Sequence, residues 1–248
     1  EDEQYRLLKQ WFEREGKGSI VVSRRMAELA IERSFVVMFV KMLCTVPESE
    51  RLKFVREQDW LGMTLLHCAA SSGNIEIIKA ILAFYPESDH LRTVNLEDVN
   101  GRTVLHYVAE SGNVESLKFI LSLYTESEEQ LQSVRTKASV DGTLLHRAAS
   151  SGNFEVFKTI LNLYPESEHL EALNTRDQNG WTVLHYAAQS GKIECVEMIF
   201  SLYPESERLR AVGLQNTQNM TVLHCAATSG NFETFKFILS LYPESERL

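Results

Sequence analysis

The sequence has few of the features that mark several classes of protein. Only four cysteines occur among 248 residues, and no two of them form a CxxC pair. This usage argues against a disulfide scaffold and a zinc module, and it suits a reducing compartment. The longest apolar run, residues 35–44, contains Lys41 and is shorter than the roughly 18–20 residues that span a bilayer. We therefore expect no membrane insertion and a cytoplasmic location.

Basic charge is also scarce, with 25 Lys and Arg against 34 Asp and Glu and a net charge of −9. A nucleic-acid backbone needs a basic patch, so we expect no nucleic-acid partner. Residues 1–10 have no signal-peptide pattern. The chain begins without Met and ends inside a repeated phrase, so we expect it to be a piece of a longer protein.

The motifs of catalysis are missing from the chain. There is no phosphate-binding glycine loop, no G-x-S-x-G and no H-E-x-x-H. Cys68 follows His67 directly, and adjacent helical residues diverge by about 100°, so they do not form a nucleophile and its base. We expect no enzymatic activity, no cofactor and no small-molecule substrate. His90 and His169 lie in acidic segments, where we expect them to be solvated.

A fixed period organises the chain. The dipeptide LH recurs at intervals of 39, 40, 39 and 39 residues, and it ends at His67, His106, His146, His185 and His224. Five copies at one period predict a solenoid of stacked units. Stacked helices lie about 8–10 Å apart, so histidines of successive units cannot share a zinc ion, whose ligands each lie about 2 Å away. We expect no metal site.

One unit shows the expected secondary structure. Residues 183–190 predict a short helix, which Gly191 ends in a left-handed conformation. Residues 192–203 carry apolar side chains at helical spacing and predict a second helix. Pro204 stops it.

The phrase "PESERLRAV" at 204–212 predicts a third, short helix. Proline suits the first position of a helix, and acidic residues in the first turn favour the helix dipole. We expect Leu209 and Val212 to point inward. The next segment, "NxxDxxGxT", predicts a tight finger whose Gly needs a positive φ, and Asp141 and Asn219 replace that Gly in two copies.

The segments "GRTVLHYVAESGNVESLKFIL" and "GWTVLHYAAQSGKIECVEMIF" resemble the ankyrin repeat over residues 50–243. The units depart from that family in having no proline before LH and in exceeding its period of about 33 residues. The resemblance implies an all-α ankyrin-repeat solenoid with an extra short helix per repeat and hairpin-like fingers. It also implies that the repeated histidine ties the finger to the helix through the backbone.

We expect an N-terminal helical cap over residues 1–49, which includes a degenerate repeat at 20–49 and a helix at 5–12. Five repeats then follow, at about 50–88, 89–127, 128–167, 168–206 and 207–248.

Positions that vary between the copies are where binding specificity is expected. The resemblance implies that fingers and first helices line a concave face that binds a partner protein. Trp, Met and Arg are enriched in interface cores, although some of these side chains could instead pack on a neighbouring finger. The finger candidates are Trp60, Leu61, Met63, Val99, Arg102, Gln178, Trp181 and Met220. The candidates that follow the repeated histidine are Tyr107, Arg147 and Tyr186.

Two functions remain open at this point. The first is a non-catalytic protein-binding module, and its long units are similar to those of effectors that intracellular bacteria deliver into host cells. The alternative is a targeting or substrate-recruiting domain of a larger enzyme whose catalytic domain lies outside this chain. The acidic phrases themselves either cap helices and aid solubility or form a docking strip for a basic partner.

Overall fold

The computed structural model describes residues 23–138 and 142–242, so the helix expected at 5–12 lies outside the described residues. Within these ranges the protein consists of helices and no β-strand, apart from an isolated bridge between Ala138 and Gly142. The predicted all-α fold class is confirmed.

The helices repeat in a three-part order. The first helices are α2 (Arg24–Glu32), α5 (Leu65–Ser72), α8 (Val104–Ser111), α11 (Leu144–Ser151), α14 (Val183–Ser190) and α17 (Val222–Ser229). The second helices are α3 (Val36–Thr45), α6 (Ile75–Leu82), α9 (Val114–Leu121), α12 (Phe154–Leu161), α15 (Ile193–Ser201) and α18 (Phe232–Ser240). The third helices are α4 (Glu48–Arg56), α7 (Glu87–Val94), α10 (Ser127–Arg135), α13 (His169–Asn174) with a 3-10 turn before it (Glu166–Glu168), and α16 (Glu205–Gly213).

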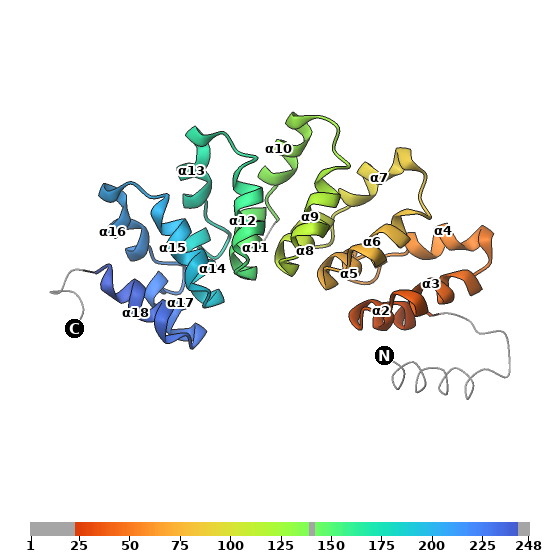
Figure 1. Ribbon diagram of the computed structural model, residues 1–248, viewed down its shortest axis with the longest axis horizontal. Helices are drawn as coiled ribbons and strands as arrows, with labels where there is room; N and C mark the ends of the chain where they lie inside the picture. The colour runs from red at the N-terminus through yellow and green to blue at the C-terminus, as the bar shows by residue number, and fades with distance from the viewer. Residues whose placement is uncertain (1–22, 139–141, 243–248) are drawn as a thin grey trace.

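Figure 1 shows these units side by side along an arc, with the third helices on its convex rim. Successive first helices pack against each other, from α2 on α5 to α14 on α17. The α2–α4 unit therefore has the helix order and stacking of the later repeats, although the proposed boundary at residue 49 stays a prediction.

The first helices α5, α8, α11, α14 and α17 each have a Thr/His capping box at the start and a left-handed glycine at the end. In α14, Thr182 and His185 form a reciprocal cap at the start, and Gly191 ends the helix with φ 70°. Both ends of the helix therefore have their backbone groups capped, and the predicted glycine cap is confirmed.

The third helix is present as predicted, with two differences. Pro204 lies at the N-cap of α16, one position earlier than expected. Val212 is buried, but Leu209 is 45% exposed, so the prediction that Leu209 points inward is wrong. The reason is that only the last turn of α16 packs on the stack, through Ala211 and Val212.

Two side chains fasten each third helix. The hydroxyl of Tyr164 donates to Val134 O at 2.7 Å, and Tyr85 makes the same bond to Val55 O in an earlier unit. The expectation that His90 and His169 are solvated is wrong, since both rings are half-buried and His90 Nε2 lies 3.0 Å from Leu82 O. His169 Nε2 lies 3.1 Å from Tyr164 O, because this position of the third helix faces the carbonyl end of the second helix.

Candidate functional site

Four of the five fingers are each closed by one acidic or amide side chain. Asp177 Oδ1 accepts the backbone N–H groups of Asn179 and Trp181, at 2.9 and 2.8 Å. Such a local bond fixes a tight turn without help from a distant element. Asp177 is the Asp of the pattern NxxDxxGxT, whose role the sequence did not indicate. The same two bonds are made in other fingers by Asp59, Asp98 and Asn216.

A positive φ also shapes the fingers, as expected. Gly180 has φ 75°, and a Cβ there would lie 3.3 Å from the backbone of Asn216 in the next finger. Asn219 takes the same conformation with φ 60°. Asp141, the other residue expected to do so, lies outside the described residues.

The third finger has a different construction. Ala138 stands where the other fingers have Asp or Asn, so it offers no side-chain acceptor. Gly142 has φ 76°, and a Cβ at this residue would lie 2.8 Å from His146 Nδ1. A side chain therefore cannot occupy this position, where other fingers carry Met63 or Trp181.

In three units the repeated histidine ties the following finger to a first helix. His146 Nδ1 accepts the N–H of Thr143 at 3.1 Å, so its Nε2 carries the proton that is donated to Thr175 O at 3.1 Å. His67 and His185 make the equivalent bonds to Leu96 O and Leu214 O. Burial lowers the pKa of His146 to about 4 and keeps the ring neutral. The predicted structural role is confirmed for these histidines.

His106 is the exception. Its ring is fully buried and its Nδ1 accepts the N–H of Thr103 at 3.1 Å, but its Nε2 has no hydrogen-bond partner. The unit that follows His106 contains the extra residue that lengthens one period to 40. Nε2 is directed toward the backbone of Thr136 without reaching hydrogen-bond geometry.

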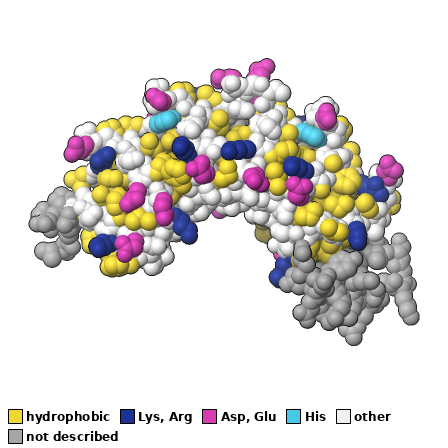
Figure 2. All heavy atoms as spheres, in the orientation of Figure 1, with side chains coloured by type: hydrophobic (Ala, Val, Ile, Leu, Met, Phe, Trp, Pro, Cys, Tyr) yellow, Lys and Arg dark blue, Asp and Glu magenta, His cyan; other side chains and the backbone are white. Residues whose placement is uncertain are grey.

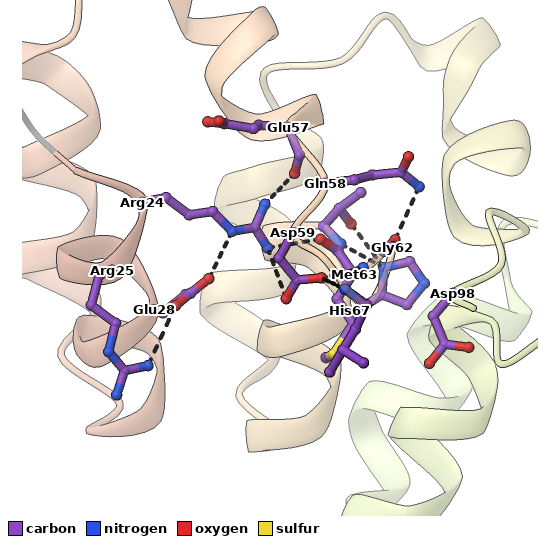
Figure 3. Close-up of polar contacts among 12 residues, drawn as sticks. Arg24, Arg25, Glu28, Glu57, Gln58, Asp59, Gly62, Met63, His67 and Asp98 are labelled. Atoms are coloured by element: carbon purple, nitrogen blue, oxygen red, sulfur yellow. Dashed lines mark hydrogen bonds and ion pairs between the residues drawn. The ribbon is translucent and has the colours of Figure 1, made fainter. Parts of the chain in front are cut away.

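The first finger is clamped by a residue of α2. Figure 3 shows the Arg24 guanidinium between the finger and its own helix. It donates to Glu57 O, to Met63 O at 2.7 Å and to the Glu28 carboxylate at 2.7 Å. It also lies 3.7 Å from the carboxylate of Asp59. No local sequence pattern indicates this clamp, because Arg24 lies 33 residues before Glu57 and 39 residues before Met63.

The clamped finger carries the most exposed large apolar side chain among the described residues. Trp60 is 86% exposed, and Val99 on the next finger is 62% exposed. The two fingers are joined by the bond from Val99 N–H to Leu61 O at 2.9 Å. Two exposed apolar side chains therefore stand on a fixed backbone.

The other finger candidates are less exposed. Trp181 is partly buried, and its ring lies 5.2 Å from Tyr186 and 5.9 Å from His185, measured between centroids. Met63 and Met220 are also partly buried against the core. For these three residues the structure provides packing partners within the chain, whereas Gln178 is exposed.

The candidates on the first helices hold the fingers in place. Tyr107 and Arg147 are only 8% and 4% exposed. The Tyr107 hydroxyl donates to Asp98 at 2.7 Å, as that of Tyr186 does to Asp177 at 2.8 Å.

A charged network crosses these helices. Glu110 lies 3.4 Å from Arg102 and 3.3 Å from Arg147. The Arg147 guanidinium lies 4.8 Å from the centroid of the Tyr186 ring. These contacts link three successive units below the fingers and position them from the helix side.

Two of the cysteines lack the low pKa of a reactive thiol. Burial raises the pKa of Cys195 to about 12 and that of Cys68 to about 11, so both thiols stay protonated at neutral pH. No group of three or more His, Cys, Asp and Glu residues could hold a metal ion in this part of the chain. Across the described ranges, none of the helices is both long and apolar enough to cross a membrane.

The stacked three-helix units and their row of fingers define a helical-repeat solenoid of the kind that presents an extended surface. A family model described as "Ankyrin repeats (3 copies)" matches residues 29–132, 122–208 and 145–246. The chain belongs to the ankyrin-repeat family, whose repeats are generally protein–protein interaction modules. A search of the curated proteins found no significant match.

Proposed function

We propose that this chain binds a partner protein through the row of fingers and the first helices beneath it. The observation that carries the proposal is Trp60, which is 86% exposed on a finger held by Arg24. Truncating a tryptophan that is buried in the core of an interface often costs about 2 kcal/mol or more of binding free energy. A mobile loop would lose conformational entropy when it binds, whereas a finger with a fixed backbone loses little.

The partner surface is centred on the first two fingers. Val99 adds a second exposed apolar side chain beside Trp60, and Leu61 lies half-buried between them. Tyr107 and Arg147 belong to the support of this surface, since both are buried.

Charge next to the fingers gives the partner an orientation. Exposed Glu97 precedes the second finger, whereas exposed Lys137 and Arg176 precede the third and fourth. A partner with basic groups toward the first two fingers and acidic groups toward the next two would be favoured over the reverse arrangement.

The test compares two double variants that each remove two exposed apolar side chains. Trp60→Ala/Val99→Ser alters the fingers, and the control Val37→Ser/Phe232→Ala alters α3 and α18, where the side chains are 64% and 69% exposed. Proteins captured from eukaryotic lysate are quantified by mass spectrometry, and the affinity of a captured partner is then measured. We expect the finger variant to lose about tenfold or more in affinity and the control to retain it. Equal losses in the two variants would contradict the proposed surface.

The proposal extends to the setting of this binding. The resemblance of the long units to those of bacterial effectors supports a host protein as the partner and a host-cell cytosol as the place. The four cysteines are unpaired, which agrees with a reducing compartment.

A further inference from the structure

The last unit, formed by α17 and α18, lies at one end of the arc (Figure 1). One side of this unit has no following unit among the described residues. The residues on that side are buried at the same positions of the four preceding units, from α5 to α15. In the last unit they are His224 and Ala227, which are exposed, and Leu223, Phe235 and Leu239, which are partly exposed. Figure 2 shows hydrophobic side chains on the surface at this end of the arc.

This end face has the side chains of an interior unit. A terminal unit that caps an array needs a polar outer face. Phe235 stands at the position of Phe157 in α12, which is fully buried, and Leu239 stands at the position of Leu161, which is 4% exposed. The side chains that elsewhere contact the next unit are therefore present in the last unit.

His224 lacks the bond that fixes a following unit elsewhere. In three units Nε2 of the repeated histidine lies 3.0–3.1 Å from the carbonyl oxygen of the residue 29 positions later. Among the described residues His224 contacts only Thr221, through Nδ1, at 3.2 and 2.9 Å. The same offset from His224 falls at position 253, beyond Leu248.

The glycine that ends each first helix shows the same pattern. The Ser116 hydroxyl of α9 donates to Gly73 O at 2.9 Å. The Thr234 hydroxyl of α18 donates to Gly191 O at 3.1 Å. Gly230 has no following second helix in the described stack to supply this donor, and a Cβ on it would meet nothing within 4 Å.

The last finger repeats the pattern on the backbone. Thr217 N–H donates to Asn179 O of the preceding finger at 2.9 Å, as Val99 N–H does to Leu61 O. Gln218 occupies the position of Asn179 in the last finger. The end face therefore has a ring donor and two backbone acceptors at the positions where interior units bind their successors.

We propose that this face binds a further unit of the same kind, formed by chain that follows Leu248. A unit in the orientation of its predecessors brings a carbonyl to His224 and donors to the carbonyls of Gly230 and Gln218. A second copy related by a twofold axis would bring the same face, with its identical donor and acceptors, to these groups. The row of fingers is then longer than the described one. The proposal does not rest on partner binding at Trp60.

The test compares the native chain with an extended chain in which a copy of residues 204–242 is inserted after Tyr242. Residues 243–248 repeat residues 204–209, so the junction keeps its native sequence, and the equivalent of Leu214 falls at position 253. We expect the amides of α17 and α18 to exchange with deuterium about tenfold more slowly or better in the extended chain, because an interior unit opens less often than a terminal one. Phe235→Lys should abolish this gain. The control Phe232→Lys, at a position that is only partly buried in the interior units, should keep it.

The native gene provides the second measurement. The codons after Leu248 should encode another LH dipeptide 39 or 40 residues after His224. A stop codon before that point would overturn the proposal, as would equal exchange of α17 and α18 in the native and extended chains. Sedimentation of the native chain as a dimer that Phe235→Lys converts to a monomer would assign the face to a second copy and overturn it as well. Trp60→Ala should change none of these results, which separates this proposal from the proposed function.

Discussion

At the scale of single residues, the same position can be compared between repeats, so that one repeat serves as the control for another. His146 and His106 are both fully buried and both accept a threonine N–H, but only His146 completes the second bond. The energy of that second bond can therefore be measured by comparing the same substitution at the two positions.

We expect His146→Asn to destabilise the protein by about 1 kcal/mol more than His106→Asn. Asparagine keeps an acceptor near the threonine N–H at either position and loses the bond to Thr175 O only at residue 146. Urea denaturation followed by circular dichroism measures both losses. If His106→Asn were the more damaging change, the assignment of the unpaired Nε2 would be wrong.

Protonation of the buried histidines makes stability depend on pH. Burial holds the pKa of His146 at about 4 in the folded state, below about 6.5 in the unfolded state. The unfolded chain therefore binds the proton first, and the free energy of unfolding falls as pH drops from 6.5 toward 4, by up to about 1.4 kcal/mol per pH unit for one histidine. His146→Asn should give a flatter profile in urea titrations between pH 7 and 4.5. Parallel profiles for the two proteins would contradict this account.

At the scale of elements, local sequence patterns predicted the three helices of each unit, but they did not predict the contacts between residues far apart in the sequence. The period, the glycine cap and the proline after the second helix are all local, so helix order followed from them. The clamp of Arg24 on the first finger joins elements far apart in sequence. The exposure of Leu209 depended on how the rim of the stack packs.

The candidate surface was also predicted only in part, because exposure depends on packing and not on residue type alone. Trp60 and Trp181 are the same residue type in equivalent fingers, and sequence reasoning treated them alike. Trp60 is the second residue of its finger and is 86% exposed, whereas Trp181 is the fifth and packs on Tyr186. Position within the finger decides exposure, because the fifth residue directly precedes the N-cap of the first helix.

The clamp on the first finger gives a prediction at this scale. Arg24→Gln removes the bonds to Glu57 O and Met63 O, so the amides of residues 57–63 should exchange with deuterium about tenfold faster or more. The control Arg25→Gln removes only exposed contacts with Glu28 and Glu32. Similar exchange in the two variants would show that the first finger holds its shape without Arg24.

At the scale of the whole molecule, the solenoid separates two surfaces. The first two fingers carry the exposed apolar side chains Trp60 and Val99, and the third helices carry Asp and Glu side chains on the convex rim. A solenoid joins these surfaces only through neighbouring units, so a partner on one side need not disturb the other.

The most direct test of the central claim is a hydrogen–deuterium exchange comparison of the chain alone and bound to its captured partner. We predict protection of residues 59–63 and 98–102, together with the first helices α5 and α8. Protection confined to the third helices, with the first two fingers exchanging as in the free chain, would contradict the finger row as the partner surface.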